Sequence, residues 1–129
     1  MTTPRLQHVS LLVPPETQET VRAFYGRLIG LEEKQPPSSL AQFKLVWFAV
    51  GEGEMELHFL PTTDRPAEND QHICLMVDDV DAYRHRLRAA GVSIIEAELI
   101  PLRPRFFCRD PFGNLIEFTT LLSEYYSAR

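Results

Sequence analysis

The chain has 129 residues, of which 44% are hydrophobic and 24% are charged, and its formal net charge at pH 7 is −5. A chain of this length can bury a core as a single domain, residues 1–129, without disulfide or metal staples. The acidic balance argues against nucleic-acid and anionic-membrane partners. No apolar run approaches the ~20 residues of a membrane span, and no signal segment opens the chain, so we expect a cytoplasmic protein.

The first quarter of the chain predicts a strand followed by a helix. Residues 6–13 (LQHVSLLV) are rich in leucine and valine and end at Pro14, which is typical of a strand. Residues 17–29 carry apolar side chains at helical spacing, and Gly30 follows them. This pattern predicts an amphipathic helix that ends at the glycine.

Three shorter strands are expected next. Residues 31–34 form a possible short strand, and residues 43–50 (FKLVWFAV) and 55–60 (MELHFL) are two clear apolar runs. The segment 51–54, Gly-Glu-Gly-Glu, joins these runs and can supply the positive φ angles of a tight hairpin. Residues 61–69 then form a polar loop.

The second half repeats this order. After a strand that opens at His72, two aspartates can cap a helix that Gly91 ends. Three strands complete the half, at residues 92–100, 105–109 and 114–120, the last two joined by the turn DPFGN. The ending LLSEYYSAR is expected to form a short helix or a flank.

A short motif supports the repeat. His8-Val9-x-Leu11-x-Val13 matches His72-Ile73-x-Leu75-x-Val77, 64 residues later. The order strand, helix, three strands therefore occurs twice, in modules of about residues 5–61 and 71–121, and predicts an α+β fold of two βαβββ units. Each unit has an open sheet face, so we expect the two to pair around a shared concave surface.

Three of the four histidines occupy repeat-related strand positions. Because strand side chains alternate between faces, Glu56 and His58 share one face of the first module, and Glu117 lies 59 residues after His58. A glutamate between apolar neighbours is costly to bury unless its charge is compensated. We therefore expect His8, His58, His72 and Glu117 to bind a divalent transition metal, Ni, Zn, Mn or Fe.

Other residues have weaker functional interpretations. Glu56 could replace His58 as a ligand or act as a base, whereas His85 is expected to be an ordinary exposed histidine. Cys74 should face the same cavity but lacks a basic neighbour in sequence, so it is not expected to be a nucleophile. The two cysteines have no CxxC spacing and are expected to be free thiols.

Cationic and aromatic side chains also occur in and near the predicted strands. Arg105 or Arg109 could hold a substrate carboxylate or phosphonate, although a solvated strand-end arginine is the simpler interpretation. Core positions are expected for most of the aromatic residues in the strands, with some lining the concave face: Phe43, Trp47, Phe48, Phe106 and Phe107.

The motifs FYxxxxGL, from Phe24, and DPFGNxIEF, from Asp110, resemble those of the vicinal oxygen chelate superfamily. That superfamily includes glyoxalase I, extradiol dioxygenases, fosfomycin-resistance thiol transferases, methylmalonyl-CoA epimerase and bleomycin-resistance proteins. The resemblance covers nearly the whole chain. It implies a cupped eight-stranded mixed sheet with helices on its outer face, usually in a homodimer, and a metal held by His8, His58, His72 and Glu117. Enzymes similar to glyoxalase I usually have glutamate or glutamine where this chain has His58.

Two classes of function follow from this resemblance. The first is a metal-dependent enzyme that chelates two neighbouring oxygen atoms of a small substrate, most simply a glyoxalase-like lyase or isomerase, with Glu56, His58 or Glu117 moving the proton. A dioxygenase or a thiol transferase on the same site is the alternative within this class. The second class is a metal-free ligand-binding protein similar to the bleomycin-resistance proteins.

Overall fold

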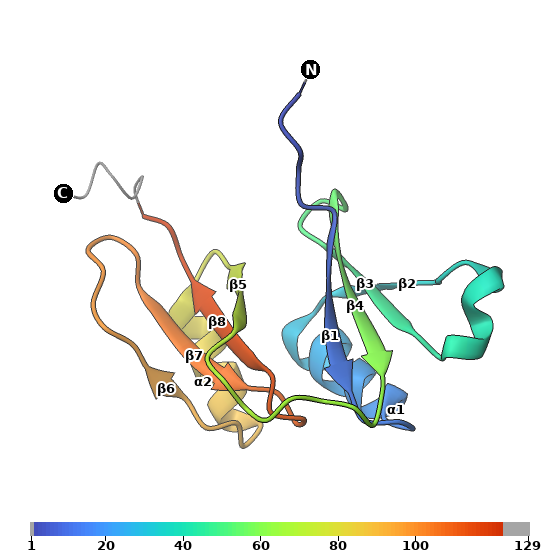
Figure 1. The fold of residues 1–129 in the computed structure, drawn as a ribbon. Helices are drawn as coiled ribbons and strands as arrows, with labels where there is room; N and C mark the ends of the chain where they lie inside the picture. Colours follow the sequence, from blue (N-terminus) through green and yellow to red (C-terminus); the bar gives the residue numbers. More distant parts are fainter. Residues whose placement is uncertain (1, 123–129) are drawn as a thin grey trace. The chain divides into compact units, whose positions relative to one another are not determined.

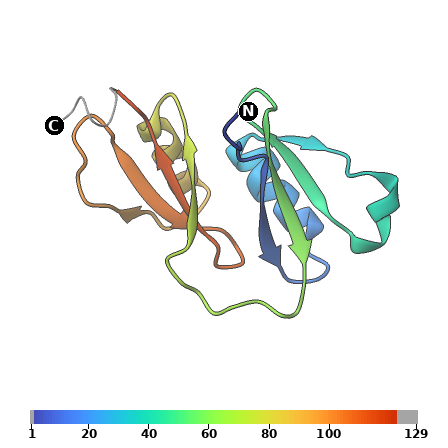
Figure 2. The ribbon, with the colours of Figure 1, turned by 45° about the horizontal axis from the view of Figure 1, so that its top comes forward.

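The computed structural model of the protein describes residues 2–122. The chain forms two compact units, Met1–Ala67 and Glu68–Arg129. Each unit contains a four-stranded sheet and a helix that lies on one face of that sheet (Figures 1 and 2). The predicted βαβββ module is therefore confirmed in both halves, and the eight strands are divided between two sheets of four.

Unit 1 has its strands in the order β1-β4-β3-β2. The first strand runs parallel to the last, and the other pairs are antiparallel. This order follows from the sequence because the helix carries the chain from β1 across the sheet, whereas β3 and β4 form the expected hairpin. Its elements are β1 (His8–Val13), α1 (Gln18–Val21), η1 (Arg22–Ile29), β2 (Glu32–Lys34), η2 (Ser38–Phe43), β3 (Val46–Val50) and β4 (Met55–Pro61).

The helix of unit 1 widens after its first turn. From Arg22 to Ile29 it is a π-helix, and its last turn closes with the Gly30 N–H donating to the Tyr25 carbonyl oxygen. Gly30 has a φ of 97°, a left-handed conformation that ends the helix at the glycine expected from the sequence. Within the helix, a Cβ on Gly26 would lie 3.2 Å from the Phe48 ring, so this glycine lets the helix approach the sheet closely.

The apolar core of unit 1 lies between this helix and one face of the sheet. The Tyr25 ring packs 4.4 Å from the Phe59 ring and 6.4 Å from the Phe48 ring, centroid to centroid. All three side chains are almost fully buried. Burial of apolar area of this kind contributes about 25 cal/mol per Å² to folding. No helix covers the opposite face of the sheet, so side chains on that face do not belong to this core.

Unit 2 has the equivalent strand order β5-β8-β7-β6, with β5 parallel to β8. Its helix α2 begins at the cap that the sequence predicts, because the Asp79 carboxylate accepts hydrogen bonds from the N–H groups of Asp81 and Ala82. Phe106 and Phe118 stack beneath this helix with 5.2 Å between their ring centroids. The elements are β5 (His72–Met76), α2 (Val80–Ala89), β6 (Ile95–Glu96), β7 (Arg105–Arg109) and β8 (Leu115–Thr119).

The turn between β7 and β8 is built around one carboxylate. Asp110 accepts hydrogen bonds from the N–H groups of Phe112 and Asn114 and from the Asn114 side-chain amide. Gly113 supplies a φ of 97°. The motif DPFGN therefore fixes the register that places β8 beside β7.

Several strands are shorter than expected, two of them by three residues or more. The strand expected over residues 43–50 begins only at Val46, because Ser38–Phe43 forms a 3₁₀ turn that Lys44 ends with a φ of 56°. The strand expected over residues 92–100 is reduced to Ile95–Glu96, which pairs with β7 at the sheet edge, and Leu99 is exposed. The helix or flank proposed for the chain end lies outside the described residues beyond position 122.

No helix between residues 2 and 122 has the length and apolar character that crossing a lipid bilayer requires.

Candidate functional site

The helix-free face of unit 1 carries polar and aromatic side chains at alternate strand positions. His8 on β1 is the register partner of Glu56 on β4. His58, two residues further along β4, is the partner of Ser10 on one side and of Trp47 on the other. Because register partners project to the same side of a sheet, these side chains gather on the face opposite the helix.

Three rings form a continuous stack on this face. The ring centroids of Trp47 and His58 are 3.8 Å apart with 1° between the ring planes. On its other side the His58 ring lies 4.1 Å from the His8 ring, at 15°. His58 is therefore held between two aromatic rings, and only 12% of its side chain is exposed.

Glu56 is the buried acid of unit 1. One of its oxygens, Oε1, lies 2.9 Å from His58 Nε2, and the other forms an ion pair with the Lys34 ammonium group. Lys34 reaches this carboxylate from β2, where its register partner on β3 is Trp47, whereas the β3 partner of Glu56 is Ala49. The Lys34 hydrogen bond, followed by that of His58, lowers the pKa of Glu56 to about 2.

His72 and Glu117 meet on the equivalent face of unit 2. The Nε2 atom of His72 lies 3.1 Å from Oε1 of Glu117, and Nδ1 of the same ring lies 2.9 Å from the carbonyl oxygen of Asp70. Because a carbonyl oxygen can only accept, Nδ1 carries the proton, and the neutral ring presents a lone pair at Nε2. A lone pair facing a carboxylate oxygen requires a cation at their contact, which is either a second proton or a metal ion.

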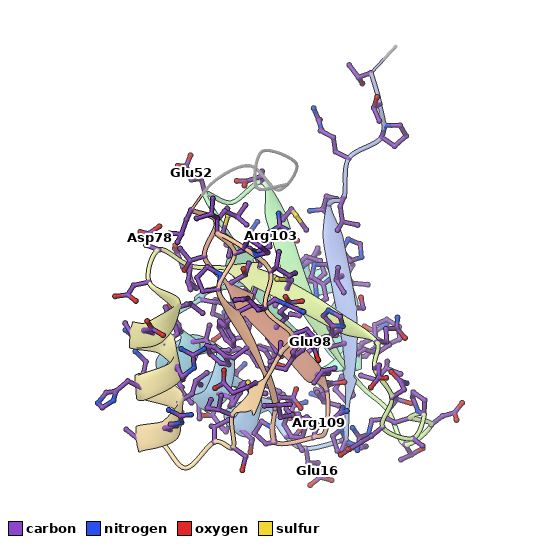
Figure 3. The ribbon with its side chains drawn as sticks, turned by 90° about the vertical axis from the view of Figure 1, so that its left-hand side faces the viewer. Glu16, Glu52, Asp78, Glu98, Arg103 and Arg109 are labelled. Atoms are coloured by element: carbon purple, nitrogen blue, oxygen red, sulfur yellow. The ribbon has the colours of Figure 1, made fainter. Side chains whose placement is uncertain are left out.

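Arg105 also contacts Glu117. Its Nη1 donates to Glu117 Oε2 at 3.3 Å and its Nη2 to the Glu98 carbonyl oxygen at 3.1 Å. Figure 3 labels Glu98 on the loop before β7, which the Arg105 side chain ties to the strand. The guanidinium lies over the Phe107 ring, 5.6 Å from its centroid. Arg105 is therefore anchored rather than solvated, and it offsets part of the buried charge of Glu117.

Cys74 lies on the same face, as the register partner of Glu117. The residue as a whole is exposed, but its thiol is partly removed from water and lies beside the Glu117 carboxylate. Desolvation, followed by this negative charge, raises the pKa of Cys74 to about 11. The thiol is therefore protonated at neutral pH, in agreement with the expectation that Cys74 is not a nucleophile. Cys108 lies on the buried face, and both cysteines are free thiols.

The structure gathers the four expected ligands as two pairs, one in each unit. His8 stacks on His58 in unit 1, and His72 contacts Glu117 in unit 2. The register confirms that His58 and Glu117 are equivalent, because each is partnered two positions after the first-strand histidine. Between residues 2 and 122, no group of three or more histidine, cysteine, aspartate or glutamate side chains is close enough to hold a metal ion.

Three side chains on these faces were not singled out for these roles from the sequence. Trp47 was expected in the core but supports the ring stack, Lys34 belonged to an uncertain connection, and Arg105 was expected in solvent. Strand alternation alone signalled that Trp47 and Phe48 face opposite sides. It could not show which of the two sides the helix covers.

A family model, "Glyoxalase/Bleomycin resistance protein/Dioxygenase superfamily", matches residues 5–118. The chain belongs to this superfamily. The match spans both βαβββ units and includes all four histidine and glutamate positions described above. No match was found among curated proteins.

Solved structures of the superfamily have the same fold. A glyoxalase-family protein from Bacillus anthracis is 30% identical, with 94% of this chain and 98% of that chain covered and a TM-score of 0.84. TnmS3, an antibiotic binding protein from Streptomyces sp. CB03234, is 25% identical, with 94% and 98% covered and a TM-score of 0.72. Lactoylglutathione lyase from Agrobacterium tumefaciens is 21% identical, with 93% and 96% covered and a TM-score of 0.70. The superfamily therefore includes both enzymes and binding proteins.

Proposed function

We propose that the protein is a metal-dependent enzyme that binds two neighbouring oxygen atoms of a small substrate, with glyoxalase-like lyase or isomerase chemistry. The observation that carries this proposal is the contact between His72 Nε2 and Glu117 Oε1, which needs a positive charge. Two units each supply imidazole and carboxylate groups on a helix-free sheet face. Nitrogen and oxygen donors of this kind suit Ni, Zn, Mn or Fe.

The Nδ1 hydrogen bonds of the two first-strand histidines, His72 and His8, also suit metal binding. A metal-binding histidine commonly donates its second ring N–H to a carbonyl or a carboxylate, which fixes the tautomer and the ring orientation. His72 makes this bond to Asp70, and His8 makes a similar one, since its Nδ1 lies 2.7 Å from the Gln7 amide oxygen. Both first-strand histidines thus direct Nε2 away from their local anchor.

The proposed donors are His8, His72 and Glu117, together with one donor from the pair His58 and Glu56. A divalent ion held by these groups would act as a Lewis acid toward the substrate oxygens. Side chains of the same faces would orient the substrate and exclude water, with the Arg105 guanidinium available for an anionic group.

Proton transfer is assigned to the two buried glutamates, Glu56 and Glu117, and their surroundings distinguish them. Glu56 is a weak base because Lys34 and His58 hold its pKa at about 2. Glu117 is therefore the better candidate to accept a proton from substrate, and Glu56 is the better candidate to hold its neighbours in place.

Elemental analysis of tag-free protein tests this proposal. We expect close to one transition metal per chain, lost in His72→Ala and retained in His85→Ala, whose histidine lies exposed on α2. Two activity assays then separate the enzyme classes. Oxygen uptake with catechols would indicate dioxygenase chemistry, and thiol-dependent loss of methylglyoxal would indicate glyoxalase-like chemistry. A metal content near zero, with no thermal shift on adding Ni(II), Mn(II), Fe(II) or Zn(II), would overturn the metal proposal.

A metal-free binding protein is the second candidate. The ion pair between Arg105 and Glu117 favours it, because the guanidinium offsets the buried charge without a metal. The net charge of −5 suits a cationic ligand. In either case we propose that the protein forms a homodimer, which light scattering during size-exclusion chromatography tests.

A further inference from the structure

Arg109 is a strand-end arginine for which the sequence left two roles open, contact with substrate or exposure to solvent. The structure shows its guanidinium group engaged within unit 2. Nη1 donates to the Gly113 carbonyl oxygen at 2.8 Å, Nη2 donates to the Asn69 carbonyl oxygen at 3.1 Å, and Nε lies 3.4 Å from Glu68 Oε2. All three nitrogens therefore contact oxygen atoms of this unit.

These bonds join the segment before β5, residues 68–70, to the turn after β7. The Glu68 side chain crosses this turn closely, because a Cβ on Gly113 would lie 2.7 Å from Glu68 Oε1. A glycine at that position leaves room for the carboxylate. At the other end of the segment, the Gln71 N–H donates to Asn69 Oδ1 at 2.8 Å. The segment is therefore held at both ends.

Asp70, within this segment, supplies the carbonyl oxygen that lies 2.9 Å from His72 Nδ1. It directly follows Asn69, whose carbonyl oxygen Arg109 binds. Strand register places His72 on β5 and Arg109 on β7 in one row, because both are partners of Leu115 on β8. Register partners project to the same side of a sheet, so Arg109 reaches the segment before His72 along the helix-free face.

The Asp70 carbonyl competes with Glu117 for the proton of the His72 ring. A neutral imidazole has one N–H, and Glu117 Oε1 lies 3.1 Å from the other ring nitrogen, Nε2. A charged acceptor generally forms the stronger hydrogen bond. The carbonyl oxygen can therefore keep the proton on Nδ1 only while its own position is fixed, and Arg109 binds the residue before it.

We propose that Arg109 is a positioning residue, which fixes residues 68–70 and, through the Asp70 carbonyl, determines that Nδ1 of His72 carries the proton. The lone pair of the neutral ring then lies at Nε2, on the side of Glu117. This inference rests on the proposed function for the part that His72 plays in the site. The position of the proton is a property of unit 2 alone, and it can be measured without a bound ion.

Nitrogen-15 NMR of the imidazole rings tests the inference on full-length, tag-free protein from which metal ions have been removed. In alkaline solution each ring holds one proton, and the protonated and unprotonated ring nitrogens have different chemical shifts. We expect the proton on Nδ1 of His72 in wild type and on Nε2 in Arg109→Met, where Glu117 accepts it. A proton on Nε2 in wild type, or on Nδ1 in Arg109→Met, would overturn the inference.

Arg84→Met is the matched control for the loss of a partly buried arginine. The Arg84 side chain is 19% exposed, against 28% for Arg109, and its guanidinium forms ion pairs with Asp81 and Glu96 in the same unit. A general effect on stability predicts that both variants change the His72 ring alike. Positioning predicts a change in Arg109→Met alone, so an equal change in Arg84→Met would overturn the inference.

Arg109→Lys provides the same test if Arg109→Met does not fold. Lysine keeps the positive charge but lacks the planar fork that donates to two carbonyl oxygens, so we expect Nδ1 of His72 to lose part of its proton. A spectrum identical to that of wild type would overturn the inference. Metal analysis of wild type tests the proposed function separately: absence of metal, with the proton shift observed as expected, would overturn the proposed function and support the inference.

Discussion

The Nε2 atom of His72 lies 3.1 Å from Oε1 of Glu117, while Nδ1 of the same ring is committed to the Asp70 carbonyl oxygen. Replacing the carboxylate with an amide removes the need for a cation, because Glu117→Gln can donate an N–H to Nε2 and accept from Arg105 with its oxygen. We expect this variant to be at least as stable as wild type without metal, and to lack the stabilisation that the proposed metal site predicts for wild type on adding Zn(II).

Differential scanning fluorimetry with and without Zn(II) measures both effects. Glu96→Gln is the control, since Glu96 pairs with Arg84 away from the helix-free face. An unchanged Zn(II) response in Glu117→Gln would contradict the assignment of Glu117 as a donor.

The ion pair between Lys34 and Glu56 predicts a dependence of stability on pH. The folded state holds the Glu56 pKa at about 2, below its usual 4.5, so the contribution is complete above pH 4.5 and is lost as the pH falls toward 2. Lys34→Met should therefore lower the free energy of unfolding at pH 7, and the difference from wild type should shrink between pH 4.5 and 2.

Urea unfolding across this pH range measures the difference. Lys44→Met is a matched control, because no ion pair of Lys44 is present among the contacts described for residues 2–122. A difference between Lys34→Met and wild type that stays constant down to pH 2 would mean that the ion pair does not stabilise the folded state.

The raised pKa of Cys74 predicts slow alkylation at neutral pH. The rate with iodoacetamide should rise about tenfold per pH unit up to pH 11, because only the thiolate reacts. Glu117→Gln removes a negative charge beside the thiol, so the profile should move to lower pH. Mass spectrometry locates the modified cysteine, and Cys108, which is fully buried, should stay unmodified in the folded protein. Fast alkylation of Cys74 at pH 7 would contradict the environment described.

Asp79 caps helix α2 with bonds from two backbone N–H groups. Asp79→Ala should lower the free energy of unfolding by about 1 kcal/mol, the usual value for an N-terminal cap. Asp78→Ala is the matched control, because the Asp78 carboxylate lies at the same end of the helix (Figure 3) but does not cap it. Equal losses in the two variants, measured by chemical denaturation, would contradict the assignment of the cap.

Most of the framework could be predicted from local patterns. Strand alternation depends on residues only a few positions apart, and so do the helix ends at glycine and the helix cap at aspartate. These features can therefore be predicted from the sequence. The equivalence of His58 and Glu117 followed from the repeat alone, and the strand registers confirm it.

Contacts that cross strands could not be predicted in the same way. Lys34 on β2 reaches Glu56 on β4 across the intervening strand β3, and Arg105 is held by a carbonyl seven residues away on an irregular loop. Such contacts depend on which strands are neighbours and on the shape of a turn. The metal set His8, His58, His72 and Glu117 remains a prediction for the same reason.

The division of each sheet into a helix-covered side and a helix-free side has an evolutionary consequence. Successive residues of one strand serve different purposes: Phe48 belongs to the buried core, and its neighbour Trp47 stacks on His58 on the helix-free face, where we propose that substrate binds. Substitutions at every second position can therefore change what is recognised without weakening the hydrophobic layer. A duplicated unit of this kind supplies two such surfaces, and in this chain the buried glutamate of one is paired with a lysine and that of the other with an arginine.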